Sequence, residues 1–138
     1  ELGIAFVAFS PVARGFLCGS LQEVDSLDAK DIRRGMPRFA PDTYAANLRL
    51  LPAYVQVAQD VGCTPAQLAI AWLLHRGPHI IPIPGTTSLS HLAEDLEAAS
   101  VTLDATTMAR LDSLINQHTV VGSRYNAQSN SEVDTENF

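Results

Sequence analysis

The stretch from residue 80 to residue 96 constrains the fold of this chain most. It reads as a short apolar strand (IIPI), a turn (PGTT) and an amphipathic helix that begins at Ser88. A strand that turns directly into a helix presents unpaired backbone N–H groups and the positive end of the helix dipole. The stretch therefore predicts an anion site, usually occupied by phosphate. The alternative is an ordinary turn in which Ser88 only caps the helix.

A second apolar run covers residues 4–9 and ends at Ser10-Pro11. Two buried-type strands separated by helices predict an α/β fold with parallel pairing, each strand buried on both faces. Pro82 and Pro84 have no N–H to donate, so regular pairing is expected to fail near them. Two strands are too few for an independent sheet of this class, so we expect the chain to be part of a larger domain.

Helix signals follow the first strand. Residues 20–42 predict a long polar loop of the kind that often forms a lid or binding loop. Asp42 is expected to cap a helix that Pro52 kinks or divides and Gly62 ends. The sequence TPAQ at residues 64–67 predicts a capping box at the start of the next helix.

The last third of the chain predicts two more helices and a tail. Ser88 and Asp104 are expected to cap the helices. The helix that begins at Ser88 should bury an apolar stripe. Its adjacent acids Glu94 and Asp95 point about 100° apart, which is too far apart for one shared carboxylate site. The stripe consists of Leu89, Leu92, Leu96 and Ala99. Residues 117–138 form a polar tail that we expect to be loosely held.

Composition narrows the function. The 138 residues carry 9 basic and 15 acidic side chains, a formal charge of −6, which disfavours nucleic-acid and anionic-membrane partners. No apolar run is long enough to span a membrane and no leader is recognised. The two cysteines form no framework, which favours free thiols in the cytoplasm. The histidines lack metal-ligand spacing, so no metal is expected.

Several segments follow one another in an order that carries a family resemblance. They are AFSPVARGFLCG (8–19), PRF (37–39), NL (47–48), CTPAQLA (63–69), IPIPGTT (81–87) and LAEDL (92–96). Together they resemble the last two strand-and-loop units of aldo-keto reductases, from about residue 3 to about residue 116. That family folds as a (β/α)8 TIM barrel and reduces aldehydes and ketones with NADPH. The resemblance implies that residues 1–138 are a single partial domain with strands seven and eight of the barrel.

The resemblance also implies a cofactor site. Its nicotinamide and pyrophosphate part would involve Ser10 and Pro11, flanked by Gly15 and Leu17. The 2′-phosphate end would be lined by Gly85, Thr87 and Ser88, and the adenosine would face His91, Glu94 and Asp95. Ser88 stands where the family often has Lys or Arg, so NADP is expected with NAD as the alternative. Asp95 stands where Asn is usual.

The family's catalytic Asp, Tyr, Lys and His come from earlier strands, so no catalytic residue is expected here. Lys30, the only lysine, lies in the polar loop. We therefore expect the fragment alone to be inactive and the small carbonyl substrate to require the complete barrel. One alternative is a non-catalytic fragment that binds nucleotide or forms oligomers through its open sheet edges. The other is a barrel enzyme of another class that binds a phosphorylated substrate.

Overall fold

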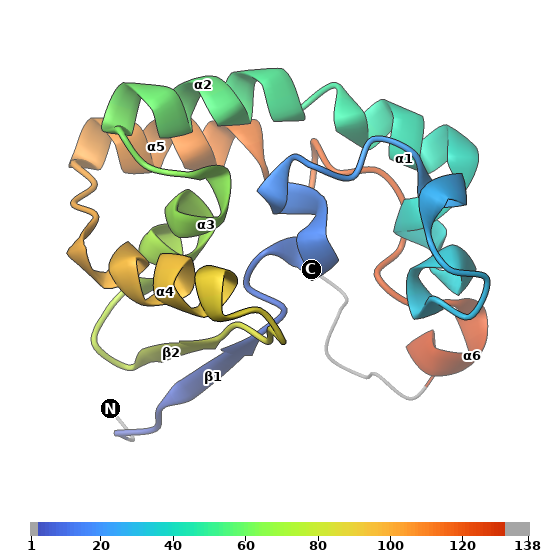
Figure 1. The fold of residues 1–138 in the computed structure, drawn as a ribbon, viewed down its shortest axis with the longest axis horizontal. Helices are drawn as coiled ribbons and strands as arrows, with labels where there is room; N and C mark the ends of the chain where they lie inside the picture. The colour runs from blue at the N-terminus through green and yellow to red at the C-terminus, as the bar shows by residue number, and fades with distance from the viewer. Residues whose placement is uncertain (1–2, 132–138) are drawn as a thin grey trace.

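The structure is a computed structural model that describes residues 3–131. Strands β1 (Phe6–Phe9) and β2 (Ile80–Ile83) pair in parallel, with Phe6 opposite Ile80 and Phe9 opposite Ile83. Helices cover one side of this pair (Figure 1). The predicted α/β class with parallel pairing is confirmed.

The expected break at Pro82 is wrong, because Pro82 pairs with Ala8 inside the ladder. The Phe6 N–H donates to the His79 carbonyl 2.7 Å away. In a parallel ladder only alternate residues of a strand direct their N–H to a given neighbour. This alternation turns the Pro82 nitrogen away from β1, so its missing N–H removes no bond from this pair.

Six α-helices and five short 3₁₀ helices make up the rest of the described elements. The α-helices are α1 (Pro41–Leu48), α2 (Leu51–Val61), α3 (Pro65–Leu74), α4 (Leu89–Glu97), α5 (Ala105–Leu114) and α6 (Ala127–Asn130). The 3₁₀ helices are η1 (Ala13–Cys18), η2 (Val24–Ser26), η3 (Ile32–Gly35), η4 (Pro37–Phe39) and η5 (Ala98–Ser100). Four of them fall in or beside the predicted polar loop, which is therefore ordered.

The helix boundaries follow most of the sequence signals. Pro52 lies in the first turn of α2, so the predicted division into two segments is confirmed. Gly62 ends α2 in the left-handed conformation, with φ of 79°. The cap predicted at Asp42 is wrong: Pro41 occupies the first turn of α1, and the N-cap is Ala40. Asp42 instead lies in the first turn, where its charge still favours the helix dipole.

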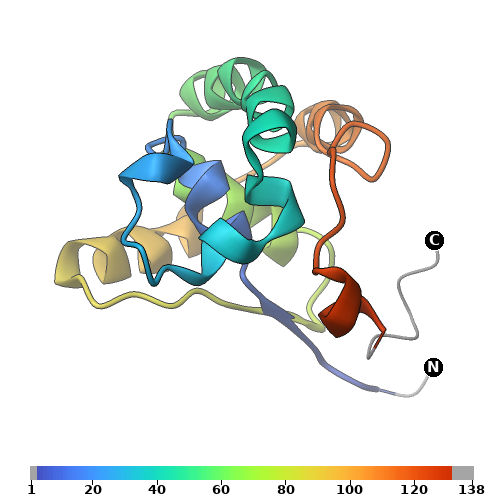
Figure 2. The same ribbon diagram turned by 90° about the vertical axis from the view of Figure 1, so that its right-hand side faces the viewer.

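The hydrophobic core lies between α2, α3 and α5. Helices α2 and α5 lie side by side (Figures 1 and 2). Leu68 and Val57 are fully buried there, and Leu111 contributes from α5. The Tyr54 hydroxyl, buried in this core, donates to the Pro65 carbonyl at 2.7 Å. The strand pair packs onto this core with only one face.

Two apolar surfaces remain exposed within residues 3–131. The face of the strand pair opposite the helices carries Val7, Phe9, Ile81 and Ile83, all about half exposed. The apolar stripe predicted to be buried on α4 is also exposed, and Leu89 reaches 85%. Burial of the strands on both faces and of this stripe is therefore wrong for the described residues. The helix instead turns its Glu94 carbonyl and Glu97 carboxylate toward α3.

The first part of the polar tail is not loosely held. Asn47, buried on α1, donates to the Val121 carbonyl at 2.9 Å and accepts from the Val121 N–H at 2.8 Å. The Arg38 Nε–H donates to the Gly122 carbonyl at 3.1 Å. These bonds fasten residues 121–122 to α1 and η4. No helix among residues 3–131 has the length and apolar character to cross a membrane.

Candidate functional site

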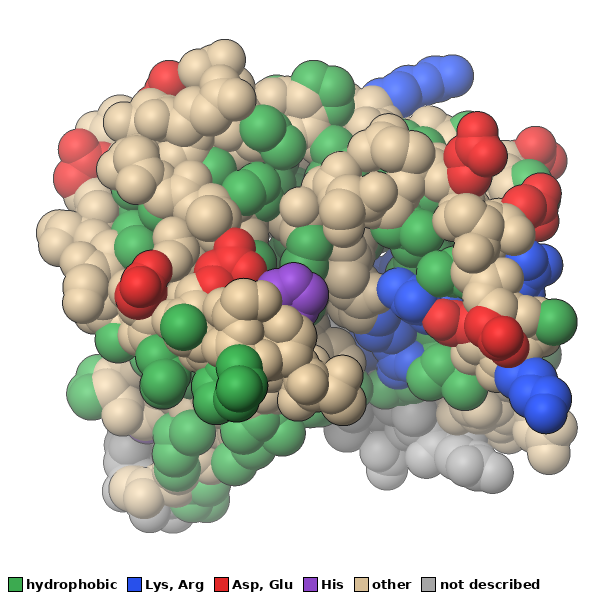
Figure 3. Space-filling view, viewed as in Figure 1, with side chains coloured by type: hydrophobic (Ala, Val, Ile, Leu, Met, Phe, Trp, Pro, Cys, Tyr) green, Lys and Arg blue, Asp and Glu red, His purple; other side chains and the backbone are tan. Residues whose placement is uncertain are grey.

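A cleft of about 520 Å³ lies between the loop that follows β1, the polar loop and the turn before α4. Five of the ten predicted cofactor residues line it: Gly15, Gly85, His91, Glu94 and Asp95. Figure 3 shows histidine and acidic side chains near α4 facing Lys or Arg side chains across a hollow in the surface. The structure thus brings residues from both predicted strand-end loops to one place.

The other five predicted residues lie elsewhere. Ser10, Pro11 and Leu17 line a second cavity of about 280 Å³, which is largely apolar and lies between β1 and the core helices. Thr87 and Ser88 line neither cavity. The Ser88 Oγ accepts from the His91 N–H at 3.4 Å, so the predicted cap of α4 is confirmed.

The loop after β1 is backbone-strained. Ser10, Ala13 and Arg14 have φ values of 52°, 50° and 58°, in the left-handed region that non-glycine residues rarely adopt. Gly15 follows with φ of 90°, and a Cβ there would lie 3.3 Å from the Arg33 Nη1. Such strain persists only where surrounding contacts hold it, and it concentrates at ligand-binding loops.

Arg33, which the sequence reading missed, holds this loop. It lines the cleft and donates from Nη1 to the Arg14 carbonyl at 3.1 Å. Asp31 clamps the same guanidinium, accepting from Nε at 2.9 Å and from Nη2 at 2.7 Å. The signal available in the sequence was the Asp-x-Arg spacing, which matches an Asp cap on η3.

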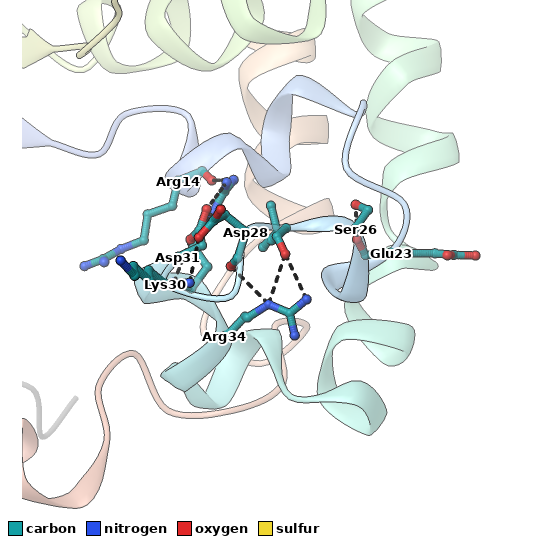
Figure 4. Close-up of polar contacts among 9 residues, drawn as sticks. Arg14, Glu23, Ser26, Asp28, Lys30, Asp31 and Arg34 are labelled. Carbon is teal, nitrogen blue, oxygen red and sulfur yellow. Dashed lines mark hydrogen bonds and ion pairs between the residues drawn. The ribbon is translucent and has the colours of Figure 1, made fainter.

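The neighbouring Arg34 braces the polar loop internally. Its Nη2 donates to the carbonyls of Asp25 and Leu27 at 2.7 and 2.8 Å. Its Nε donates to the Leu27 carbonyl at 3.1 Å and to the Asp28 carbonyl at 3.2 Å, the latter bond drawn in Figure 4. The loop carbonyls, which have no strand or helix partner, are satisfied by this side chain. The wall of the cleft formed by η3 is therefore held from both sides.

Glu94 and Asp95 line one side of the cleft, and Arg33, in its ion pair with Asp31, lines another. Burial, followed by the nearby Glu94 and Asp95 carboxylates, raises the pKa of the Cys18 thiol. Burial and then Glu94 also raise the pKa of Asp95. On the opposite wall, hydrogen bonds from Arg33 lower the pKa of Asp31 to about 2. Carboxylates accept hydrogen bonds from hydroxyl and amino groups, whereas a guanidinium and backbone N–H groups bind anions. The cleft therefore suits a ligand that carries hydroxyl or amino groups and also an anionic group.

The hydroxyls of the two buried tyrosines are engaged in structural bonds. Tyr44 donates to the Leu21 carbonyl at 2.7 Å, as Tyr54 does to Pro65. Burial raises the pKa of both phenols. A lysine close to a phenol would lower its pKa. Lys30 lies in the polar loop, where its backbone N–H donates to the Asp28 carboxylate. Among residues 3–131 no group of three or more His, Cys, Asp or Glu side chains could hold a metal ion.

Comparison with known proteins agrees with the resemblance. Residues 1–116 match the aldo/keto reductase family. The chain belongs to this family. It is 34% identical over 124 residues to an aldo-keto reductase of Strobilurus tenacellus, covering 90% of this chain and 37% of the relative. It is also 34% identical over 133 residues to the aldo-keto reductase yakc of Schizosaccharomyces pombe, whose name carries NADP(+), covering 96% of this chain and 39% of that protein.

A solved structure shares the fold. The crystal structure of a thermostable aldo-keto reductase in complex with the inhibitor epalrestat matches with a TM-score of 0.50 and 26% identity. The match covers 80% of this chain and 30% of that one. The chain thus corresponds to part of an aldo-keto reductase TIM barrel and spans about two fifths of the length of the curated relatives it matches.

Proposed function

We propose that this chain is the C-terminal, cofactor-binding part of an NADP-dependent aldo-keto reductase and supplies strands seven and eight of the barrel. The observation that carries the proposal is the cleft where the loops after β1 and β2 meet, since both loops leave the carboxyl ends of parallel strands. That end of a barrel is where active sites lie. The uncovered face of the strand pair and the exposed stripe on α4 fit a barrel interior and a helix layer completed by further strands and helices.

In this proposal, different residues of the cleft bind different parts of the dinucleotide. Gly85 and the turn that follows it would face the adenosine phosphate, near the N-terminus of α4. Glu94 and Asp95 would accept from ribose or adenine donors, and His91 lines the same part of the cleft. Gly15 and Arg33 would flank the pyrophosphate. The family resemblance would add Ser10, Pro11 and Leu17 beside the nicotinamide and pyrophosphate, and Thr87 and Ser88 at the 2′-phosphate end.

When bound, NADPH supplies a hydride to a carbonyl carbon. The proton for the resulting alkoxide must come from another group, and neither buried tyrosine of residues 3–131 is suited to supply it. The hydroxyls of Tyr44 and Tyr54 are bonded to backbone carbonyls and their pKa values are raised, the opposite of what a proton donor at neutral pH needs. Following the family resemblance, we assign the catalytic Asp, Tyr, Lys and His to other strands of the complete barrel.

Titration of the 138-residue chain with NADPH, NADH and a sugar phosphate tests the proposal. We expect NADPH to bind, and to slow alkylation of Cys18 in a Cys63→Ser background, because Cys18 lines the cleft. Carbonyl-dependent oxidation of NADPH by this chain should be absent. Binding of the sugar phosphate alone would favour a barrel enzyme of another class, and turnover would contradict the assignment of catalysis to other strands.

A further inference from the structure

Carboxylates line the part of the 520 Å³ cleft that adjoins α4. Glu94 and Asp95 both line it, and His91 lines it from the preceding turn of the same helix (Figure 3). The negative charge of the two carboxylates acts inside the cleft, because after burial it is Glu94 and then Asp95 that raise the pKa of the Cys18 thiol. A further negative charge at this end of the cleft is therefore repelled.

Lysine and arginine contribute little to the lining of the same cleft. Among the described residues that line it, Arg33 is the one arginine, and no lysine is present. The Arg33 guanidinium is already engaged, with Nε and Nη2 donating to the Asp31 carboxylate and Nη1 donating to the Arg14 carbonyl. The lining residues therefore offer a phosphate at the α4 end neither a lysine nor an uncommitted guanidinium.

The turn before α4 uses its own hydroxyls to satisfy N–H groups of the helix start. The Thr86 Oγ1 accepts from the Ser88 N–H at 3.1 Å, and the Ser88 Oγ accepts from the His91 N–H at 3.4 Å. The hydroxyls of Ser88 and Ser90 lie 2.8 Å apart and bond to each other. Two of the N–H groups that a helix N-terminus can offer to an anion are thus already bonded within the chain.

We propose that Asp95 and Glu94 set the cofactor preference of the cleft: their carboxylates accept from the hydroxyls of an unphosphorylated ribose and repel a 2′-phosphate, so that the chain accepts NADH as well as NADPH. The inference rests on the proposed function, which brings the adenosine to this end of the cleft. Dinucleotide sites commonly bind the ribose 2′-hydroxyl of NAD with an acidic side chain and the 2′-phosphate of NADP with an arginine. Burial and then Glu94 raise the pKa of Asp95, which shows that negative charge is already crowded here.

The test is calorimetric titration of the 138-residue chain with 2′,5′-ADP and AMP, which carry only the adenosine end of NADPH and NADH. At pH 8 a phosphate carries two charges and an ordinary imidazole is neutral. We expect the two affinities to agree within about threefold in the wild type. Asp95→Asn and Glu94→Gln should each raise the affinity for 2′,5′-ADP relative to AMP about tenfold, because each removes a charge that repels the 2′-phosphate. Glu23→Gln removes the same charge from an exposed site outside the cleft and should leave the ratio unchanged.

Parallel titrations with NADPH and NADH separate this inference from the proposed function. If the dinucleotides bind but Asp95→Asn and Glu94→Gln leave the ratio of 2′,5′-ADP to AMP affinity unchanged, the inference is overturned and the cofactor site stands. A wild-type chain that binds 2′,5′-ADP at least tenfold more tightly than AMP would overturn it too, and so would an equal shift of the ratio in Glu23→Gln. A chain that binds none of the four ligands would contradict the proposed function together with this inference.

Discussion

Arg33 reaches across nineteen residues of sequence to the carbonyl oxygen of Arg14, 3.1 Å from its Nη1. This bond links the polar loop to the strained turn after β1, and it places the guanidinium within 3.3 Å of where a Cβ of residue 15 would lie. The two loops that line the cleft are therefore held together by this hydrogen bond. Hydrogen bonds from a charged donor contribute about 1.5–3 kcal/mol when well shielded, enough to hold one strained residue.

Replacing Arg33 should loosen the cleft. In Arg33→Met the Arg14 carbonyl loses its donor and Asp31 loses its partner, so we expect NADPH affinity to fall about tenfold, equivalent to about 1.4 kcal/mol. Fluorescence titration with NADPH measures the change. Arg49→Met serves as the matched control, because it removes an exposed arginine away from the cleft. Equal affinities in both variants would contradict the role given to Arg33.

Asp31 should make stability depend on pH below about 4. Arg33 lowers its folded-state pKa to about 2, beneath the ordinary value near 4. The contribution of the ionised carboxylate is therefore fully present above the ordinary value and is lost as pH falls from about 4 to about 2. Urea unfolding of wild type and Asp31→Asn should show a stability difference at pH 6 that shrinks at pH 2.5. A difference that stays constant would rule out this linkage.

Replacing Gln67 should lower the stability of the fold more than replacing an ordinary capping residue does. Its Oε1 accepts from the Thr64 N–H at 3.0 Å to complete the capping box, and its Nε2 donates to the Glu94 carbonyl at 3.2 Å. Thr64→Ala removes one cap bond and should cost about 1 kcal/mol. Gln67→Leu leaves groups on both α3 and α4 unpaired and should cost about 2 kcal/mol. Chemical denaturation ranks the two, and a reversed order would show that the link to α4 adds nothing.

The sequence predicted local structure well where one residue decides it. The Thr64–Gln67 capping box, the end of α2 at Gly62 and the caps of α4 and α5 all follow from the chemistry of single side chains. The failed prediction at Pro82 has a different origin. Whether a missing N–H matters depends on which side of the strand it faces, and that follows from register, not from residue type.

Contacts between distant segments could not be predicted from the sequence, because they leave no periodic signal. The bond from Arg33 to the Arg14 carbonyl comes from a loop that the sequence pattern describes only as polar. The bond from Asn47 to the Val121 carbonyl holds a segment that was expected to be loosely held. The placement of Gly15, Gly85 and His91 in one cleft came instead from the family resemblance. The burial of the α4 stripe was predicted from periodicity, which identifies an apolar face but does not identify its partner.

Ser88→Arg should change cofactor preference. Ser88 caps α4 and offers no charge to a 2′-phosphate, whereas an arginine can bind phosphate with two parallel hydrogen bonds. We expect NADPH affinity to rise while NADH affinity stays the same or falls slightly, since losing the cap costs about 1 kcal/mol of helix stability. Ser88→Gln, similar in reach but uncharged, is the control. A rise of equal size for both cofactors would place residue 88 away from the 2′-phosphate.

The exposed stripe on α4 should tolerate charge in this chain. Leu96 is 68% exposed, so Leu96→Lys should change the free energy of unfolding by less than about 0.5 kcal/mol. Leu68→Ala, at a fully buried position of α3, should instead cost about 2–5 kcal/mol. Leu96→Lys should also lower any concentration-dependent association, because an apolar stripe is a contact surface. Denaturation and sedimentation velocity measure both effects. A cost for Leu96→Lys as large as that for Leu68→Ala would mean that α4 is packed against a partner, within the chain or in a second copy.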